Sequence, residues 1–169
     1  MLETKRLKIV PLTHEQLLLY KYNPEQLALE LNIRYTQRQN DPLVDGDLQE
    51  ATEFWIKKTA IHPTEFQWYT TWEIILKDEN VAVGGIGFSG APGDHCTSMI
   101  GYGLDIRYHR KGIASEALEA MIKWGFLNGL ETIVADTPIN HYASQSVLIK
   151  SGFVESGRDE TVIHWRLDK

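Results

Sequence analysis

The feature that most constrains this chain is a segment in which an expected strand runs directly into an expected helix, through His109-Arg110-Lys111-Gly112-Ile113-Ala114. The first turn of a helix leaves several backbone N–H groups without acceptors, and the helix dipole adds positive potential there. Gly112 and Ala114 leave room for a ligand to approach this backbone, and Arg110 and Lys111 add positive charge beside it. The segment therefore predicts a site for a phosphate-bearing ligand.

The competing interpretation of this segment is an ordinary helix start, because many helices begin with glycine and many loops hold lysine and arginine. The segment is not a Walker A loop, since the sequence holds no Gly-x4-Gly-Lys-Ser/Thr. It also lacks the three spaced glycines of the dinucleotide fingerprint. The local pattern thus indicates phosphate recognition without identifying the ligand.

Length and composition narrow the class of protein. The 169 residues predict one domain that spans residues 1–169. Cys96 is the only cysteine, which excludes an internal disulfide and fits a reducing cytosol. The start of the chain has no apolar signal segment and no apolar run is long enough to cross a bilayer. We therefore expect a cytoplasmic protein with no membrane partner.

Charge and histidine spacing exclude further classes. The formal net charge is −6, and basic residues form only local clusters, so we expect no nucleic-acid partner. The six histidines show no His-x3-His spacing, so we expect no metal. An acidic surface favours cationic substrates such as amines through long-range attraction, although it also serves solubility alone.

The periodicity of apolar residues predicts a mixed α/β (α+β) fold with a largely antiparallel first half. Trp68, Trp72, Ile74 and Leu76 share one face of an expected strand, which places Glu73 on the other face. The expected strands cover residues 4–12, 66–76, 81–88, 97–106, 132–136 and 161–167, the last as a strand or hairpin. The expected helices follow Thr13 and cover residues 24–31, 47–61, 112–128 and 142–150.

At residues 109–114 the sequence resembles motif A of the GNAT acetyltransferases, which reads Gln/Arg-x-x-Gly-x-Gly/Ala after the fourth strand. The glycine and alanine positions match at Gly112 and Ala114, whereas His109 stands where the family has Gln or Arg, so a contact of this side chain with coenzyme A (CoA) stays open. The resemblance spans nearly the whole chain and is closest to the branch that contains the ribosomal-protein N-terminal acetyltransferases. Its other supports are Leu2-Glu3-Thr4-Lys5-Arg6-Leu7, Ile100-Gly101-Tyr102, Pro138-Ile139-Asn140 and Lys150-Ser151-Gly152-Phe153.

The resemblance implies a central mixed, largely antiparallel sheet of about six to seven strands, flanked by helices and splayed between the fourth and fifth strands. It implies acetyl-CoA as cosubstrate, with the pantetheine arm between the splayed strands. The backbone of Leu104 to Ile106 would pair with the pantetheine, and the N–H of Leu104 would stabilise negative charge on the thioester oxygen. The backbone that would cradle the pyrophosphate belongs to Arg110, Lys111, Gly112, Ile113, Ala114 and Ser115.

The resemblance also implies a contact from the segment before the last helix. Asn140 would touch the cofactor or cap that helix, although the asparagine of the family aligns better with His141. Glu116 is common in the motif A helix and is expected to be structural.

The implied reaction is transfer of acetyl to a primary amine, on a peptide N-terminus or a small molecule, by direct attack in a ternary complex. Ser144 stands where the N-terminal acetyltransferase branch has a serine, and would protonate the leaving thiolate. Its alternative role is packing or capping in the last helix. Tyr142 is a second acid, with surface exposure as its alternative. The tyrosine acid of many family members is replaced here by Leu148.

The sequence identifies the general base less clearly than the acid. Glu73 would accept the amine proton through water if its face of the strand lines the acceptor cleft. The alternative is a solvent-facing strand residue. The branch often has glutamate just before Ile-Gly-Tyr, where this chain has Met99.

Acceptor recognition and assembly follow from the resemblance only in outline. The aromatic side chains of Tyr35, Trp55, Trp68 and Tyr69 would form an apolar slot for the amine, or belong to the core. We expect acetyl-CoA and an amine-bearing acceptor as partners. The oligomeric state stays open, with a homodimer as one alternative. The replacements at Leu148 and Met99 also leave open a non-catalytic acyl-CoA-binding sensor or assembly module.

Overall fold

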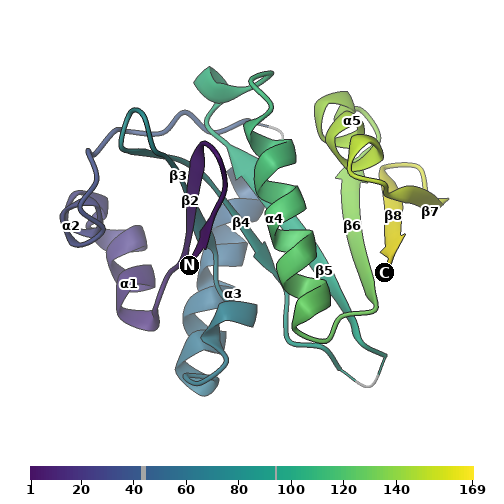
Figure 1. Ribbon diagram of the computed structural model, residues 1–169, viewed down its shortest axis with the longest axis horizontal. Helices are drawn as coiled ribbons and strands as arrows, with labels where there is room; N and C mark the ends of the chain where they lie inside the picture. Colours follow the sequence, from purple (N-terminus) through teal and green to yellow (C-terminus); the bar gives the residue numbers. More distant parts are fainter. Residues whose placement is uncertain (43–44, 94) are drawn as a thin grey trace.

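The computed structural model describes residues 1–42, 45–93 and 95–169. Within this described part the chain forms one sheet with helices on both of its faces (Figure 1). The elements are β1 (Leu2–Glu3), β2 (Leu7–Pro11), α1 (His14–Tyr22), α2 (Pro24–Glu30), α3 (Asp45–Ile61), η1 (Phe66–Trp68), β3 (Trp72–Leu76), β4 (Val81–Phe88), β5 (Thr97–Leu104), η2 (Ile106–Tyr108), α4 (Ile113–Leu127), β6 (Thr132–Pro138), α5 (Tyr142–Lys150), β7 (Val154–Arg158) and β8 (Val162–Asp168).

The described strands lie in the order β1-β2-β3-β4-β5-β6-β8-β7, and all neighbours are antiparallel except β5 and β6. The predicted mixed, largely antiparallel sheet is therefore confirmed. It holds eight strands, more than predicted, because two-residue β1 pairs with β2 and the C-terminal segment forms the hairpin β7–β8.

Helix α4 covers one face of the sheet, and α3 lies behind the other face (Figure 1). Trp124 of α4 packs against the rings of Trp68, Trp72 and Phe88, with centroids 4.3, 5.0 and 5.9 Å away. Leu118 and Met121 of the same helix are fully buried. These apolar contacts hold α4 against the sheet.

Three predicted strands are shorter in the structure, and the first of them, expected over residues 4–12, covers only Leu7–Pro11. Residues 66–68 form a 3-10 helix, and β3 begins only at Trp72, because the hydroxyl of Thr70 donates to the carbonyl of Leu12 at 2.8 Å where the chain bends. β5 ends at Leu104, because the carboxylate of Asp105 accepts the N–H of Arg107 and starts η2.

The predicted splay of the sheet lies between β5 and β6. These two strands pair only at residues 97–99 with residues 132–134. Beyond that point β5 continues on β4 as far as Leu104, while β6 continues on β8 as far as Pro138. The two halves of the sheet thus part and open a gap in which a ligand can reach strand backbone.

Candidate active site

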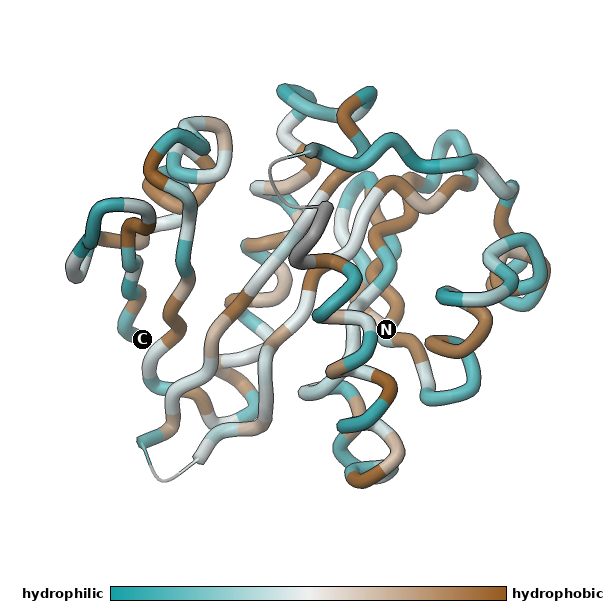
Figure 2. The backbone as a smooth tube through the Cα atoms, turned by 180° about the vertical axis from the view of Figure 1, so that it is seen from behind, coloured by the Kyte–Doolittle hydropathy of each residue, from teal (hydrophilic) through white to brown (hydrophobic). Residues whose placement is uncertain are grey.

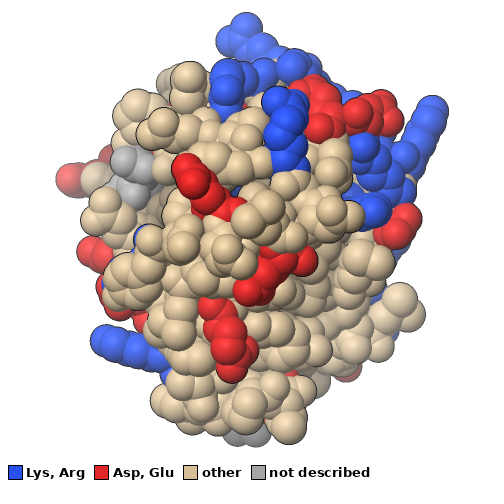
Figure 3. All heavy atoms as spheres, turned by 90° about the vertical axis from the view of Figure 1, so that its left-hand side faces the viewer, with Lys and Arg blue, Asp and Glu red and all other residues tan. Residues whose placement is uncertain are grey.

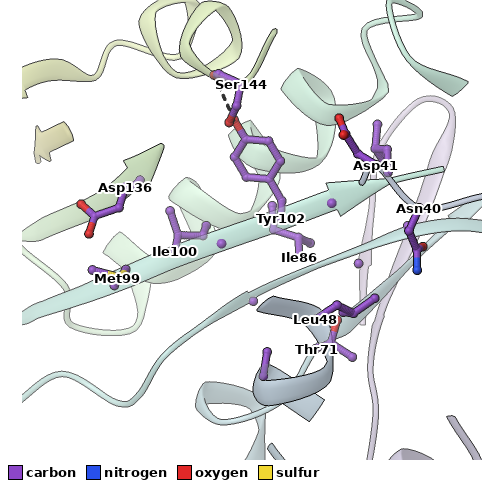
Figure 4. Close-up of a pocket in the computed structure, with 18 of the residues that line it drawn as sticks. Asn40, Asp41, Leu48, Thr71, Ile86, Met99, Ile100, Tyr102, Asp136 and Ser144 are labelled. Carbon is purple, nitrogen blue, oxygen red and sulfur yellow. Dashed lines mark hydrogen bonds between the residues drawn. The ribbon is translucent and has the colours of Figure 1, made fainter. Parts of the chain in front are cut away.

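A cavity of about 440 Å³ opens where β5 and β6 part. One wall is β5, the other is β6 with the start of α5, and the side chains of α3 and of residues 38–41 close it. Tyr102 points across the cavity toward Ser144, while Leu48 and Thr71 lie on the other side of β5 (Figure 4). Its lining includes Arg38, Asp41, Leu48, Ala51, Phe54, Trp55, Thr71, Met99, Gly101, Tyr102, Gly103, Leu104, Asp105, Asp136, His141 and Ser144.

The β5 backbone offers hydrogen-bonding groups to this cavity. The carbonyl of Met99 accepts from the N–H of Ser89 at 2.9 Å, and the N–H of Asp105 donates to the carbonyl of Val83 at 2.9 Å. At both ends of β5, therefore, the backbone N–H and C=O groups of odd-numbered residues point toward β4. Those of even-numbered residues, including Leu104, point toward the gap. The Leu104 carbonyl lies 3.1 Å from His109 Nε2, which leaves its N–H as the group that faces the cavity.

Ile106 does not provide the backbone pairing predicted for it. Its N–H donates to the carbonyl of Gln39 at 2.9 Å, and its carbonyl accepts the N–H of His109 at 3.2 Å. Because the strand ends at Leu104, both backbone groups of Ile106 are used within the chain.

The segment from Arg110 to Ser115 forms a concave stretch of backbone at the start of α4. Arg110 and Gly112 have positive φ angles of 61° and 73°. Glycine suits such a position because it has no Cβ. The first helical hydrogen bond runs from the N–H of Glu116 to the carbonyl of Gly112 at 3.2 Å, so the preceding N–H groups of the helix have no helical acceptor. This geometry fits the predicted pyrophosphate cradle.

Glu116 anchors this segment to the N-terminal strands, as its expected structural role requires. Its carboxylate accepts from Thr4 Oγ1 at 2.5 Å, from the backbone N–H of Arg6 at 2.9 Å and from Arg6 Nε at 2.6 Å. Arg6 also donates to the carbonyl of Lys111 at 2.8 Å. Burial alone would raise the pKa of Glu116, but the hydrogen bonds from Thr4 and Arg6 outweigh it and lower the pKa.

Positive charge gathers at the same end of the molecule. Figure 3 shows the largest group of Lys and Arg at its upper edge, the end at which α4 begins in Figure 1, whereas Asp and Glu are spread over the face turned to the viewer. The ammonium of Lys111 lies 4.8 Å from the centre of the Tyr108 ring. An anionic ligand at the cradle would lie in a favourable field.

Ser144 lies on the first turns of α5 and points into the cavity. Its Oγ is 2.9 Å from the hydroxyl of Tyr102, and its carbonyl accepts from the same hydroxyl at 3.2 Å. Burial raises the pKa of Tyr102 to about 12, so this phenol stays protonated. In the sequence Tyr102 belongs to the Ile100-Gly101-Tyr102 motif that flanks the cradle, and nothing local marks it as a proton donor. Tyr142, the second acid considered, is 72% exposed and matches its surface alternative.

Glu73 is buried, so its interpretation as a solvent-facing residue is wrong. Only 2% of its side chain is exposed, and its Oε2 is paired with the guanidinium of Arg38. Burial raises the pKa of the Glu73 carboxyl, and Arg38 opposes that shift. Glu73 lines a second cavity of about 260 Å³, whereas Arg38 lines both cavities. Arg38 was not predicted from the sequence, because it lies 35 positions from Glu73 and no local pattern marks it.

Asn140 lies in the exposed turn before α5, and the capping role considered for it is wrong. The residue that caps α5 is His141, whose side chain makes no cap hydrogen bond. His141 lines the main cavity, with Nε2 3.5 Å from the carboxylate of Asp41. A contact of Asn140 or His141 with the cofactor stays a prediction.

The four aromatic residues considered for acceptor binding do not form one slot. Trp55 lines the main cavity and Tyr35 lines the second. Trp68 belongs to the core, where its ring centroid is 4.3 Å from that of Trp124. Tyr69 stacks on His62 at 4.3 Å. The apolar wall of the main cavity comes instead from α3, which adds Leu48, Ala51 and Phe54.

The sequence profile of the acetyltransferase (GNAT) domain matches residues 6–154. The chain belongs to the GNAT acetyltransferases. It is 26% identical to the uncharacterized N-acetyltransferase YjdG of Bacillus subtilis (strain 168) over 166 residues, which cover 98% of this chain and 96% of that protein. It is 33% identical to the uncharacterized N-acetyltransferase YoaA of the same strain over 87 residues, which cover 51% of this chain and 49% of that protein.

Solved structures share the fold of this GNAT protein at lower identity. The ribosomal-protein-S5-alanine acetyltransferase of Vibrio fischeri superposes with a TM-score of 0.69 at 18% identity, covering 99% of this chain and 95% of that one. RimL, a ribosomal L7/L12 α-N-protein acetyltransferase solved with coenzyme A, superposes with a TM-score of 0.68 at 15% identity, covering 98% and 95%. As a GNAT acetyltransferase, this enzyme uses acetyl-CoA as its acetyl donor.

Two further findings concern the described part of the chain. No helix there is both long and apolar enough to span a membrane. No three His, Cys, Asp or Glu side chains of the described residues gather in an arrangement that would hold a metal ion.

Proposed function

We propose that this GNAT enzyme transfers the acetyl group to a primary amine, on a peptide N-terminus or a small molecule, by direct attack in a ternary complex. The observation that carries the proposal is the cavity at the split between β5 and β6. Met99, Gly101 and Gly103 turn their side-chain positions to the α3 face of the sheet, and Tyr102 turns to the other face. The cavity therefore opens to both faces, so that donor and acceptor can meet in the gap.

The donor would be held along β5 and at the start of α4. The N–H of Leu104 faces the gap and would donate to the thioester oxygen, where negative charge develops during attack. The backbone from Arg110 through Ser115 would receive the pyrophosphate, with Ile113 and Ala114 in the first helical turn. Bound there, acetyl-CoA supplies a reactive thioester, and alignment with the amine provides much of the rate.

Ser144 and Tyr102 would protonate the departing thiolate. Their hydroxyls are within hydrogen-bond distance of each other, and both lie in the wall of the cavity. Tyr102 has a pKa of about 12 and stays protonated, so it can return a proton to Ser144 after Ser144 has donated its own to sulfur. The half-buried pair can thus deliver one proton to the sulfur.

Glu73 would support the site indirectly. Its carboxylate is paired with Arg38, and Arg38 lines the main cavity whereas Glu73 lines only the second one, which argues against direct proton transfer from the amine to Glu73. We assign Glu73 the role of fixing Arg38, whose neighbour Gln39 donates its N–H to Asp105 at 3.2 Å, beside the end of β5.

Names of the related solved structures support an amine acceptor. They include RimL, an L7/L12 α-N-protein acetyltransferase, and a spermidine N-acetyltransferase chimera, whose names give a protein α-nitrogen and spermidine as acceptors. The apolar wall of α3 and the carboxylates of Asp41 and Asp136 suit an ammonium attached to an apolar group.

A thiol-release assay with acetyl-CoA and a panel of amines and N-terminal peptides tests the proposal. We expect turnover with at least one acceptor class. Acetyl-CoA binding without turnover on any acceptor would favour the alternative, a non-catalytic acyl-CoA sensor or assembly module. Light scattering of the purified chain tests the homodimer in the same preparation.

A further inference from the structure

The reaction needs a proton acceptor in the main cavity, which Glu73 does not line. The carboxylate of Asp136 lines this cavity from β6. Its Oδ1 lies 2.7 Å from Nδ1 of His164, which occupies the paired position on β8. The side chains of Asp136 and His164 are 40% and 45% exposed, so a substrate can reach the pair.

Asp136 is placed next to the point at which the strands part. Met99 of β5 pairs with Val134 of β6, and Asp136 is two residues further along the same face. Figure 4 shows Asp136 and Met99 at one end of the cavity, away from Asn40 and Asp41. The methionine side chain cannot accept a proton, whereas the carboxylate on the neighbouring strand can.

The other carboxylates around the cavity are less suited to this role. Asp105 is 1% exposed and accepts hydrogen bonds from Arg107 and from the N–H of Gln39. These bonds outweigh burial and lower its pKa to about 2, which makes it a poor base. Asp41 lies at the opposite end of the cavity and faces His141 at 3.5 Å.

We propose that Asp136 is the catalytic base that takes the proton of the acceptor ammonium, and that His164 is a positioning residue that orients its carboxylate. The proposal rests on the amine acetyltransferase function given above. The base acts on the α3 face, while Ser144 and Tyr102 act from the other face. The two proton-transfer groups therefore stand on opposite sides of the gap that would hold the thioester.

The protons and bonds balance without a further reactant. The nitrogen loses one proton to Oδ2 of Asp136, and its lone pair forms the N–C bond as the C–S bond breaks. Of the two protons that the nitrogen loses in all, one leaves Asp136 for solvent. The second nitrogen proton replaces the proton that the Ser144–Tyr102 pair gives to sulfur. The products are therefore the amide, the thiol and one released proton.

The charges around His164 predict the pH dependence. The groups that face its ring in the described structure are Asp136 of β6 at Nδ1 and Asp159 before β8, whose Oδ2 lies 3.9 Å from Nε2. Arg166, two residues along the same face, is paired with Asp168. The hydrogen bond and charge of Asp136, with a smaller contribution from Asp159, raise the pKa of His164. The imidazolium below that pKa would weaken Asp136 as a base, so kcat/KM should rise as His164 loses its proton.

The experiment measures kcat, kcat/KM across pH and the Kd of acetyl-CoA for Asp136→Asn and His164→Gln. We expect Asp136→Asn to lower kcat by about 100-fold or more, the usual contribution of a general base, with the acetyl-CoA Kd unchanged. His164→Gln should lower kcat less and move the rising limb of the kcat/KM profile to lower pH. Asp168→Asn, which removes a carboxylate of β8 outside the cavity, is the matched control and should keep the wild-type rate.

Wild-type turnover in Asp136→Asn at every pH would overturn the proposal. A loss of acetyl-CoA affinity in step with the loss of rate would also overturn it, because the carboxylate would then act in donor binding or folding. An unchanged pH profile in His164→Gln would remove His164 from the mechanism. If the wild-type enzyme binds acetyl-CoA and acetylates no amine at all, the proposed function fails instead of the assignment of the base.

Discussion

The hydroxyl of Tyr102 lies 2.9 Å from the hydroxyl of Ser144, across the gap between β5 and the start of α5. The two residues are 42 positions apart in the chain. Both side chains line the cavity, and their contact connects the two hydroxyls that, under the proposed function, pass a proton to sulfur.

The first prediction concerns this pair. Ser144→Ala should lower kcat by about 10-fold to 100-fold, because the thiolate loses its nearest donor. The Kd of acetyl-CoA should change little, since the cradle at the start of α4 is separate from Ser144. Tyr102→Phe should give a similar loss, and the double variant should lose no more than the larger single effect. Unchanged turnover in Ser144→Ala would remove it from the mechanism.

The second prediction concerns the cradle. Gly112→Asp should abolish acetyl-CoA binding in calorimetry while the circular dichroism spectrum stays native, because it sets negative charge and bulk against the pyrophosphate. Gly112→Asn is the matched control, since asparagine tolerates the positive φ of 73° and is nearly the same size without the charge. A measurably tighter Kd for Gly112→Asn than for Gly112→Asp would isolate the charge effect. Wild-type affinity in Gly112→Asp would contradict the placement of the phosphates.

The third prediction concerns the buried ion pair of Glu73 and Arg38. Glu73→Gln should destabilise the fold by roughly 3 kcal/mol, because it leaves the guanidinium without a charged partner in a buried site. Urea unfolding measures this change. Glu3→Gln removes an exposed partner of Lys77 and should leave the unfolding midpoint within error of the wild type. Equal midpoints for both variants would show that Glu73 does not hold Arg38 in solution.

The fourth prediction follows from Asp105, whose pKa falls from 3.8 to about 2 in the folded protein. A lowered carboxyl pKa stabilises the fold above the unfolded value, and that contribution is lost as the pH falls through the folded value. The shift corresponds to about 2 kcal/mol at neutral pH. Asp105→Asn should therefore unfold at lower urea concentration at pH 7, and the difference from wild type should shrink between about pH 4 and pH 2.

A failure of this prediction would be informative about the end of β5. If the difference between Asp105→Asn and wild type stayed constant as the pH fell, the hydrogen bonds to Arg107 and Gln39 would not depend on the charge of Asp105. The same variant should also raise the Kd of acetyl-CoA, because these bonds hold the turn between Leu104 and the cradle.

Parts of this site were predictable from short segments. The cradle at residues 110–115 is local, because the positive φ at Gly112, the start of α4 and the unpaired N–H groups follow from neighbouring residues. The predicted position of Ser144 in the last helix and the splay beside Leu104 also agree with the structure, since the family motifs lie at matching spacings. The end of β5 has a local and a distant cause. The N–H of Arg107 donates to the nearby Asp105, whereas the hydrogen bond between Ile106 and Gln39 joins distant segments and was not predictable in this way.

The sequence by itself therefore determined the family, the mixed sheet and the acetyl donor, all of which depend on local backbone conformation and motif order. The tertiary structure decided which side chains meet in the gap. It buried Glu73 against Arg38, joined Tyr102 to Ser144 and set Asp136 beside His164. The physical reason is that each of these contacts depends on a distance of a few ångströms between side chains, and each joins residues 28 to 42 positions apart.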